Sequence, residues 1–209
     1  VWKTWFPLAL SWLMMGIELP FLSAIVARLA NPETNLGAYG GVVFPLSLLI
    51  EAPIIMLLTA STKLTRDLSS YHKIWKFTIL SGGSLSALHL LVALTPMFDL
   101  IAGNLLGVEG DVLEKSRLGM IIMTPWTFAI AHRRFNQGIL IRFGKSKAVG
   151  WGTLVRLAAD AIVLFTCFFI APNIESDSLG IIAATAAVCA GVIAEAVYAA
   201  WRVRPIVPN

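Results

Sequence analysis

Residues 179–201 read LGIIAATAAVCAGVIAEAVYAAW, a run of apolar and small side chains that contains one charged residue, Glu195. A helix needs about 20 consecutive, mostly apolar residues to cross the hydrocarbon core of a bilayer. Five further segments of the chain meet the same requirement. The sequence therefore predicts an all-α, polytopic membrane protein with six transmembrane helices, at about 4–26, 38–60, 75–94, 118–139, 151–171 and 179–201.

The composition of the whole chain agrees with a membrane protein. Of its 209 residues, 57% are hydrophobic and 13% are charged, whereas soluble domains average about 45–50% apolar and about 25% charged residues. A chain with so few charges lacks the polar coat of a soluble enzyme. Its two cysteines, Cys167 and Cys189, lie inside apolar runs, so neither a disulfide framework nor a zinc site is expected.

The segment between the third and fourth predicted spans is a different kind of element. Residues 98–108 are largely apolar, but about 11 residues are too few to cross the hydrocarbon core. We expect this segment to form an interfacial helix or a re-entrant turn.

The basic residues are unevenly distributed among the loops. Twelve of the 16 Lys and Arg residues lie near the termini, in the 60–74 and 132–147 loops or at the start of the third span, and three, Arg28, Lys115 and Arg117, lie in the alternate loops. Loops rich in Lys and Arg remain in the cytoplasm. Both termini are therefore expected to be cytoplasmic, in a plasma or inner membrane. The tryptophans expected at cytoplasmic helix ends are Trp5, Trp75, Trp151 and Trp201.

Five ionisable residues remain inside the predicted spans. Each costs at least about 2.5–3.5 kcal/mol near the centre of a membrane helix, so each is expected to face a partner or a wet cavity. A protein that retains five of them is expected to be more than a hydrophobic anchor. These residues are Glu18, Glu51, Arg156, Asp160 and Glu195.

Glu18 and Glu51 each precede a proline by two residues, Pro20 and Pro53. A proline inside a helix removes one backbone hydrogen bond and frees a carbonyl near residue i−4, which here belongs to Gly16 or Leu49. A carboxylate beside free carbonyls is a set of oxygen atoms that can bind Na⁺ or hold a proton. The alternative is that each Glu is paired structurally with a basic or hydroxyl side chain.

The other intramembrane residues allow two interpretations each. Arg156 and Asp160 are four residues apart, which favours an intrahelical ion pair; alternatively, Arg156 holds an anionic substrate that Asp160 orients. Glu195 is expected to snorkel or to pair with Arg202, and His89 is either a proton relay or a hydrogen-bonded structural residue. The candidate substrate and ion-coupling residues are Glu18, Glu51, His89, Arg156 and Asp160.

The run HRRFNQG at 132–138 is expected to end the fourth helix on the cytoplasmic side. Cations there complement the helix carboxyl terminus and the anionic leaflet; the alternative roles are gating and an anion vestibule. Gly82, Gly83 and residues 183–191 form small-residue faces expected to serve close helix packing.

Several common functions have no support in the sequence. It contains no Ser/His/Asp arrangement, P-loop or GxGxxG motif, so we expect no enzymatic activity and no catalytic residues. Its basic residues are dispersed over four loops rather than collected on one face, which argues against nucleic-acid binding. No metal site and no cofactor are expected beyond H⁺ or Na⁺ as a coupling ion.

A series of motifs resembles a known transporter superfamily. The residues that carry the resemblance are WFPLAL at 5–10, TP at 124–125, AHRR at 131–134, QG at 137–138, RFGK at 142–145, Arg156, LGIIAAT at 179–185, Gly191 and Glu195. Together they resemble one six-helix half of the MATE-like exporter and flippase superfamily. Within it the likeness is greatest to the progressive ankylosis family of membrane transporters.

This resemblance implies a secondary transporter with two six-helix bundles around a central cavity, working by alternating access. MATE exporters couple the efflux of drugs or metabolites to Na⁺ or H⁺, often through an acidic residue in the first helix, which Glu18 matches most nearly. Progressive ankylosis proteins are associated with export of anions such as pyrophosphate, citrate or nucleotides. The arginines would suit anions, whereas the intramembrane acids favour cations. A lipid-linked sugar flippase and a non-transporting membrane scaffold remain as alternatives.

The departure from the superfamily is one of size. A complete member should have about twelve spans in two bundles, and six are predicted here. Because six is an even number, a second bundle fused to this one would lie parallel to it, related by an axis along the membrane normal. The chain also begins with Val rather than Met. We therefore expect one half of a longer chain, or else a homodimer of half-transporters, with the bilayer and a small-molecule substrate as the other partners.

Overall fold

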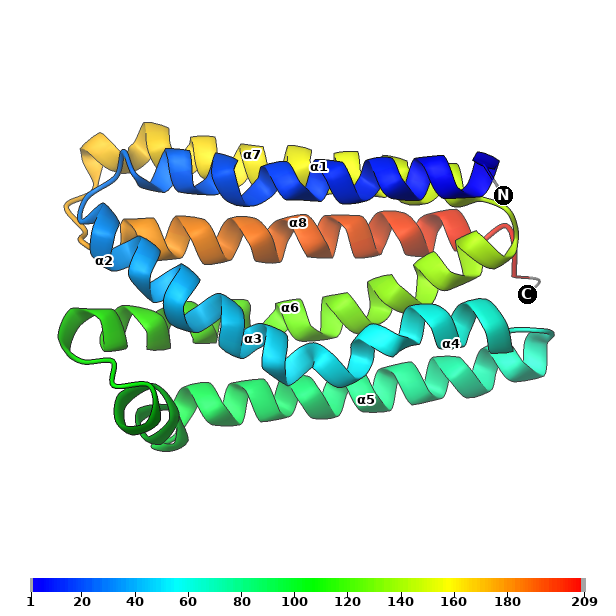
Figure 1. Ribbon diagram of the computed structural model, residues 1–209, viewed down its shortest axis with the longest axis horizontal. Coiled ribbons are helices and arrows are strands. Elements are labelled where there is room, and N and C mark those ends of the chain that lie inside the picture. Colours follow the sequence, from blue (N-terminus) through cyan, green and yellow to red (C-terminus); the bar gives the residue numbers. More distant parts are fainter. Residues whose placement is uncertain (1, 208–209) are drawn as a thin grey trace.

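The computed structural model describes residues 2–207 as a bundle of long helices (Figure 1). The fold is 87% helical, and no β-strand occurs within the described residues. The long helices are α1 (Trp2–Val26), α5 (Leu68–Leu94), α6 (Gly110–Arg142), α7 (Ser146–Ile170) and α8 (Leu179–Val203). Shorter pieces connect α1 to α5, namely α2 (Pro32–Leu36), η1 (Gly37–Val43), α3 (Phe44–Glu51), η2 (Ala52–Met56) and α4 (Leu57–Leu64).

Five helical segments of the described chain are long and apolar enough to cross a membrane. They are Trp5–Val26, Pro32–Leu64, Leu68–Leu94, Ser146–Asn173 and Leu179–Val203. They contain the predicted spans at 4–26, 38–60, 75–94, 151–171 and 179–201 almost entirely, and they indicate an integral membrane protein. The predicted span at 118–139 lies within α6, which is not among these five segments. Its sequence contains several charged residues, which lower its hydropathy.

The helices form layers around α8. Helices α6 and α7 both pack against α8; α1 covers α7, while α4 and α5 cover α6 (Figure 1). The outward faces of the peripheral helices are apolar and exposed, as at Leu13 in α1 (73%), Leu80 in α5 (69%) and Ile162 in α7 (67%). A soluble protein rarely exposes so much apolar surface, whereas a bilayer solvates it.

The short segment at 98–108 contains the helix η3 (Asp99–Leu105), which is followed by a turn. It lies at the end of the bundle opposite both termini (Figure 1). Arg117 of α6 forms an ion pair with Asp99 and lies over the ring of Phe98, which ties this segment to the start of α6.

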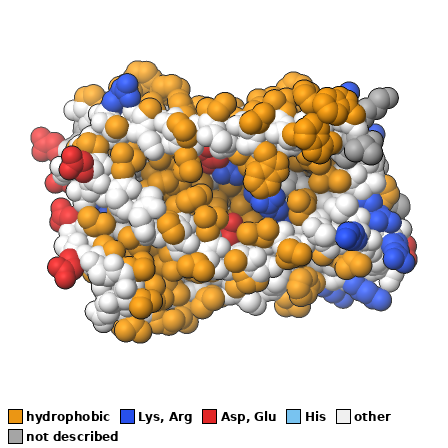
Figure 2. All heavy atoms as spheres, in the orientation of Figure 1, with side chains coloured by type: hydrophobic (Ala, Val, Ile, Leu, Met, Phe, Trp, Pro, Cys, Tyr) orange, Lys and Arg blue, Asp and Glu red, His pale blue; other side chains and the backbone are white. Residues whose placement is uncertain are grey.

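The two ends of the bundle differ in charge. Figure 2 shows most of the acidic side chains at the end opposite the termini and most of the Lys and Arg side chains at the end that carries them. The predicted 132–147 loop is wrong, because α6 continues to Arg142 and places Arg133 and Arg134 among the helices. Ten of the 16 basic residues still belong to the terminal end.

Two glycines set the distance between α6 and its neighbours. A Cβ atom on Gly82 of α5 would lie 2.8 Å from the Cβ of Ala131, and one on Gly138 of α6 would lie 2.6 Å from the carbonyl oxygen of Leu58 in α4. Gly83, in contrast, faces open space. The predicted packing role is therefore confirmed for Gly82 and is wrong for Gly83.

We predict that Gly138→Ala destabilises the bundle, whereas Gly83→Ala does not. The added methyl at position 138 meets a backbone atom and the Ser61 hydroxyl, which itself donates to the Leu57 carbonyl oxygen. Overpacking of this kind costs about 1–3 kcal/mol. Thermal unfolding in detergent tests the pair: equal stability of both variants would contradict the close α4–α6 contact.

Candidate functional site

Seven charged residues from five helices converge in the interior of the bundle. Six of them are buried, and Arg134 is partly buried. We call them the charge cluster: Glu18 of α1, Glu51 of α3, Arg133 and Arg134 of α6, Arg156 and Asp160 of α7, and Glu195 of α8. Basic and acidic side chains are visible in the middle of the face drawn in Figure 2, between apolar side chains of α1 and of the α3–α4 segment.

Glu195 lies at the centre of the cluster, with 1% of its surface exposed. Arg133 donates to its Oε2 at 2.6 Å, Gln137 donates to its Oε1 at 2.8 Å, and Arg156 Nη1 lies 3.9 Å from Oε2. The predicted partner Arg202 is wrong. Because α6 runs on past residue 132, Arg133 and Gln137 occupy successive turns of the helix face that meets α8.

Arg156 pairs with α1 rather than with its own helix. Its Nη2 donates to Glu18 Oε1 at 2.6 Å. The predicted intrahelical pair with Asp160 is wrong, because in the interior the long guanidinium reaches a carboxylate on the neighbouring helix. This ion pair and the hydrogen bond from Thr153 Oγ1 to Ser11 Oγ, at 3.1 Å, both join α1 to α7.

Asp160 has neither a hydrogen bond nor an ion pair within the described structure. Among the described residues, neither carboxylate oxygen has a hydrogen-bond partner, and only 2% of the residue is exposed. A Cβ atom on Gly191 of α8 would lie 1.8 Å from Asp160 Oδ1. The absence of a side chain at position 191 therefore creates the space that the carboxylate occupies.

Glu51 ends α3 at a change of helix type. Its Oε2 has no hydrogen-bond partner in the described structure, and the two arginines of α6 lie within electrostatic range of its carboxylate. Pro53 follows in the 3₁₀ segment η2. The Leu49 carbonyl, predicted to be free, accepts a hydrogen bond from the Ala52 N–H. That part of the predicted ion site is therefore wrong.

The charges of the cluster do not balance. It contains four carboxyl groups and three guanidinium groups, and a buried charge is tolerated when it is paired. One bound proton or one monovalent cation completes the balance. Each of the three arginines also keeps a buried Nε–H that has no acceptor among the described residues. The cluster therefore has unsatisfied groups of both kinds: carboxylate oxygens and guanidinium N–H donors.

A small cavity of about 40 Å³ opens beside the arginines. It is large enough for one or two water molecules. Five helices contribute to its wall, including Trp12 and Met15 of α1, Leu58 of α4, Thr153 of α7, and Arg133, Arg134, Gln137 and Glu195.

His89 lies apart from the cluster. It is fully buried, and its two ring nitrogens lie 2.9 Å from Thr127 Oγ1 and 3.0 Å from the Met120 carbonyl oxygen. Thr127 is six residues before Arg133, or about 9 Å along α6 at about 1.5 Å per residue. Both ring nitrogens are therefore engaged in joining α5 to α6, which matches the structural interpretation of His89.

The candidate residues predicted from the sequence did not include Arg133, Arg134, Gln137 or Glu195, although an anion vestibule was one alternative for residues 132–138. One signal was available, since Arg133 and Gln137 are four residues apart and share a helix face. The position of Glu195 in a span of small residues was a second signal, because small residues mark a helix face that meets another helix.

No protein-family model, no curated protein and no solved structure matches this chain. The likeness to MATE-like exporters consequently rests on the motifs quoted above. A functional conclusion must come from the charges, the burial and the position of the cluster inside the bundle.

We predict that Glu195→Gln lowers the stability of the protein by about 3–5 kcal/mol, because it leaves Arg133 buried without a counter-charge. The double variant Arg133→Met, Glu195→Leu removes both charges and should recover most of the loss.

Thermal unfolding in detergent measures both effects. Asp99→Asn is the matched control, since its ion pair with Arg117 is partly exposed and should be worth at most about 1 kcal/mol. A double variant no more stable than Glu195→Gln would show that the ion pair is not the source of the loss.

Proposed function

We propose that this chain is one half of a secondary active membrane transporter, which exports a small organic or anionic metabolite or drug by alternating access, coupled to H⁺ or Na⁺. The observation that carries the proposal is Asp160, a buried carboxylate with no partner among the described residues, in a cluster with one carboxyl more than its guanidiniums. Intramembrane ionisable residues mark ion and substrate pathways in transporters.

A purely structural role accounts poorly for this arrangement. Structural charges inside a membrane gain most when every group is paired, and an unpaired buried charge destabilises the fold. The pairs of Arg133 with Glu195 and of Arg156 with Glu18 meet that requirement. The uncompensated carboxylate does not, and a reversibly bound cation supplies the missing partner in one state of a transport cycle.

Helix α6 is the sixth crossing in this proposal. Its charges at Arg133 and Arg134 face the bundle interior, where other helices shield them from lipid, as membrane proteins require. The concentration of basic residues at the terminal end supports cytoplasmic termini by the positive-inside rule. The apolar outer faces support placement in a bilayer, which we propose to be a plasma or inner membrane.

The geometry offers a direct coupling step. With a proton or Na⁺ at Asp160, Arg156 remains bound to Glu18 and holds α1 against α7. When the cation leaves, Asp160 becomes a negative charge one helical turn from Arg156 and competes with Glu18 for it. Transfer of the guanidinium to Asp160 breaks the ion pair between α1 and α7 and weakens the hold on α1. Cation binding thereby biases the position of α1 between two states.

The substrate class follows from the arginines. Their three buried Nε–H donors lack acceptors among the described residues, and Arg133 and Arg134 line the cavity. Guanidinium groups bind carboxylates and phosphates well. An organic or phosphorylated anion, recognised after α1 moves and the cavity enlarges, fits these donors better than a cationic drug does.

We predict that Asp160→Asn abolishes the response of the protein to its coupling ion. Hydrogen–deuterium exchange of α1 and α7 is followed in proteoliposomes, first during exchange of choline for Na⁺ at constant ionic strength and then across a pH series. In the wild type, the protection of the α1 and α7 amides against exchange should change either in the Na⁺ series or in the pH series. Asp160→Asn should remain in the cation-loaded pattern, and Asp99→Asn should behave as the wild type does.

A flux assay tests the transport step itself. Proteoliposomes of the native gene product, under an imposed Na⁺ or proton gradient, are assayed with labelled citrate, pyrophosphate and ATP. Glu18→Gln should abolish coupled flux while the protein stays folded and inserted. The transporter proposal would be refuted if Glu18→Gln and Asp160→Asn changed only thermal stability and the wild type showed no response to Na⁺ or pH. The protein would then be interpreted as a membrane scaffold.

A further inference from the structure

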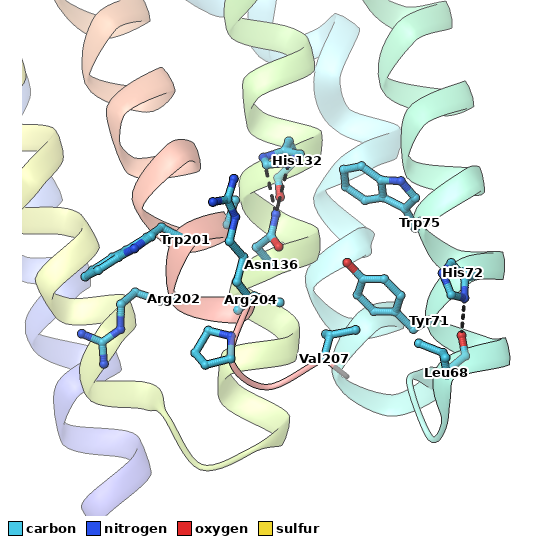
Figure 3. Close-up of a pocket in the computed structure, with 13 residues that line it drawn as sticks. Leu68, Tyr71, His72, Trp75, His132, Asn136, Trp201, Arg202, Arg204 and Val207 are labelled. Carbon is cyan, nitrogen blue, oxygen red and sulfur yellow. Dashed lines mark hydrogen bonds between the residues drawn. The ribbon is translucent and has the colours of Figure 1, made fainter. Parts of the chain in front are cut away.

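A second and much larger cavity lies at the end of the bundle that carries both termini (Figure 3). Its volume is about 1160 Å³, beyond the range of about 300–1,000 Å³ that is typical of small-molecule pockets. Helices α5, α6 and α8 and the residues after α8 line it. No residue of the charge cluster lines it. We call it the terminal groove.

One part of the terminal groove is aromatic. Tyr71 and Trp75 of α5 line it, and both pack against the buried ring of Phe135, with centroid distances of 5.4 and 5.3 Å. The Trp75 ring also meets His132 edge-on, at 5.3 Å. Trp201 of α8 also lines the groove and is largely exposed, and its ring points away from Tyr71 and Trp75 (Figure 3). Tyr71 and Trp75 give the groove a broad apolar face with polar edges, as suits the membrane–water interface.

The other part of the groove is cationic. Arg202 and Arg204 contribute to the lining, and neither forms an ion pair within the described chain. In Figure 3, the Arg204 side chain points toward His132. The Asn136 amide nitrogen lies 3.4 and 3.5 Å from the two ring nitrogens of His132. Among the described residues, no Asp or Glu lines the groove.

The position of the groove at the end of the bundle favours an anionic lipid over a small soluble anion. Tryptophan and tyrosine gather at the level of lipid headgroups, and basic pockets between membrane helices bind anionic headgroups. A small soluble anion would use the arginines and leave the large aromatic part of the groove empty. A phospholipid uses both parts.

We propose that the terminal groove binds an anionic phospholipid. Its phosphate lies between Arg204 and His132, Arg202 adds charge at the rim, and its glycerol backbone and the adjoining part of its acyl chains pack against Tyr71 and Trp75. This site is separate from the transport cycle proposed above and does not depend on it, so failure of either proposal leaves the other standing.

The test measures lipid binding to the purified protein. The native gene product in a nonionic detergent is titrated with short-chain phosphatidylglycerol or phosphatidylcholine, and bound lipid is counted by native mass spectrometry. Phosphatidylglycerol should bind at least about tenfold more tightly than phosphatidylcholine. The double variant Arg202→Gln, Arg204→Gln should weaken phosphatidylglycerol binding by about 30-fold, from two basic residues near the headgroup.

The matched control is Lys145→Gln, Lys147→Gln. It removes the same charge from exposed residues at the start of α7, outside the groove, and should bind phosphatidylglycerol as the wild type does. If the control weakened phosphatidylglycerol binding as much as Arg202→Gln, Arg204→Gln does, the loss would come from net charge alone, and the proposal would be overturned. Equal binding of phosphatidylcholine would overturn it too, because an unspecific lipid annulus needs no arginine.

Three further measurements test the aromatic contact and distinguish the lipid from other occupants. Millimolar inorganic phosphate should not displace phosphatidylglycerol; if it does, the groove is a site for soluble phosphate rather than lipid. Trp75→Leu should weaken phosphatidylglycerol binding severalfold by narrowing the aromatic surface. A groove covered by a second copy of the chain, detected as a dimer that excludes phosphatidylglycerol, would also overturn the proposal.

Discussion

The need to neutralise charge within an apolar bundle governs this structure. Glu195 is 1% exposed on α8, and the cavity beside it, about 40 Å³ in volume, is too small for a full hydration shell. Arg133 and Gln137 must therefore reach it from α6, and that requirement fixes the register of these two helices. The same need joins α1 to α7, because Arg156 finds its carboxylate at Glu18. Two ion pairs thus connect four of the long helices at one level of the bundle.

Buried charges also require space, and Gly191 supplies it for Asp160. A Cβ atom at position 191 of α8 would lie 1.8 Å from Asp160 Oδ1, so an alanine there would exclude the carboxylate. Contact between α7 and α8 is given up at this point to admit an acid that has no hydrogen-bond partner among the described residues. A proton or cation at that position restores the balance that the fold otherwise lacks.

Hydropathy located five of the apolar crossings, because a membrane span is a local property of about 20 residues. The pairing of charges was not accessible in this way. Spacing along one helix favoured Arg156 with Asp160, yet the guanidinium binds an acid 138 positions away in the chain. Arg133 was expected to complement a helix end, because the length of α6 was underestimated. The local sequence shows which charged residues lie inside the membrane spans. Which side chains neutralise them depends on how the helices pack.

One turn of α6 belongs to both sites. Arg133 and Gln137 face Glu195, while His132 and Asn136, each one residue earlier, line the terminal groove. Successive residues of an α-helix are rotated by about 100°, so two pairs with the same four-residue spacing point to two different faces. Helix α6 therefore contributes to two separate sites through adjacent faces of a single turn.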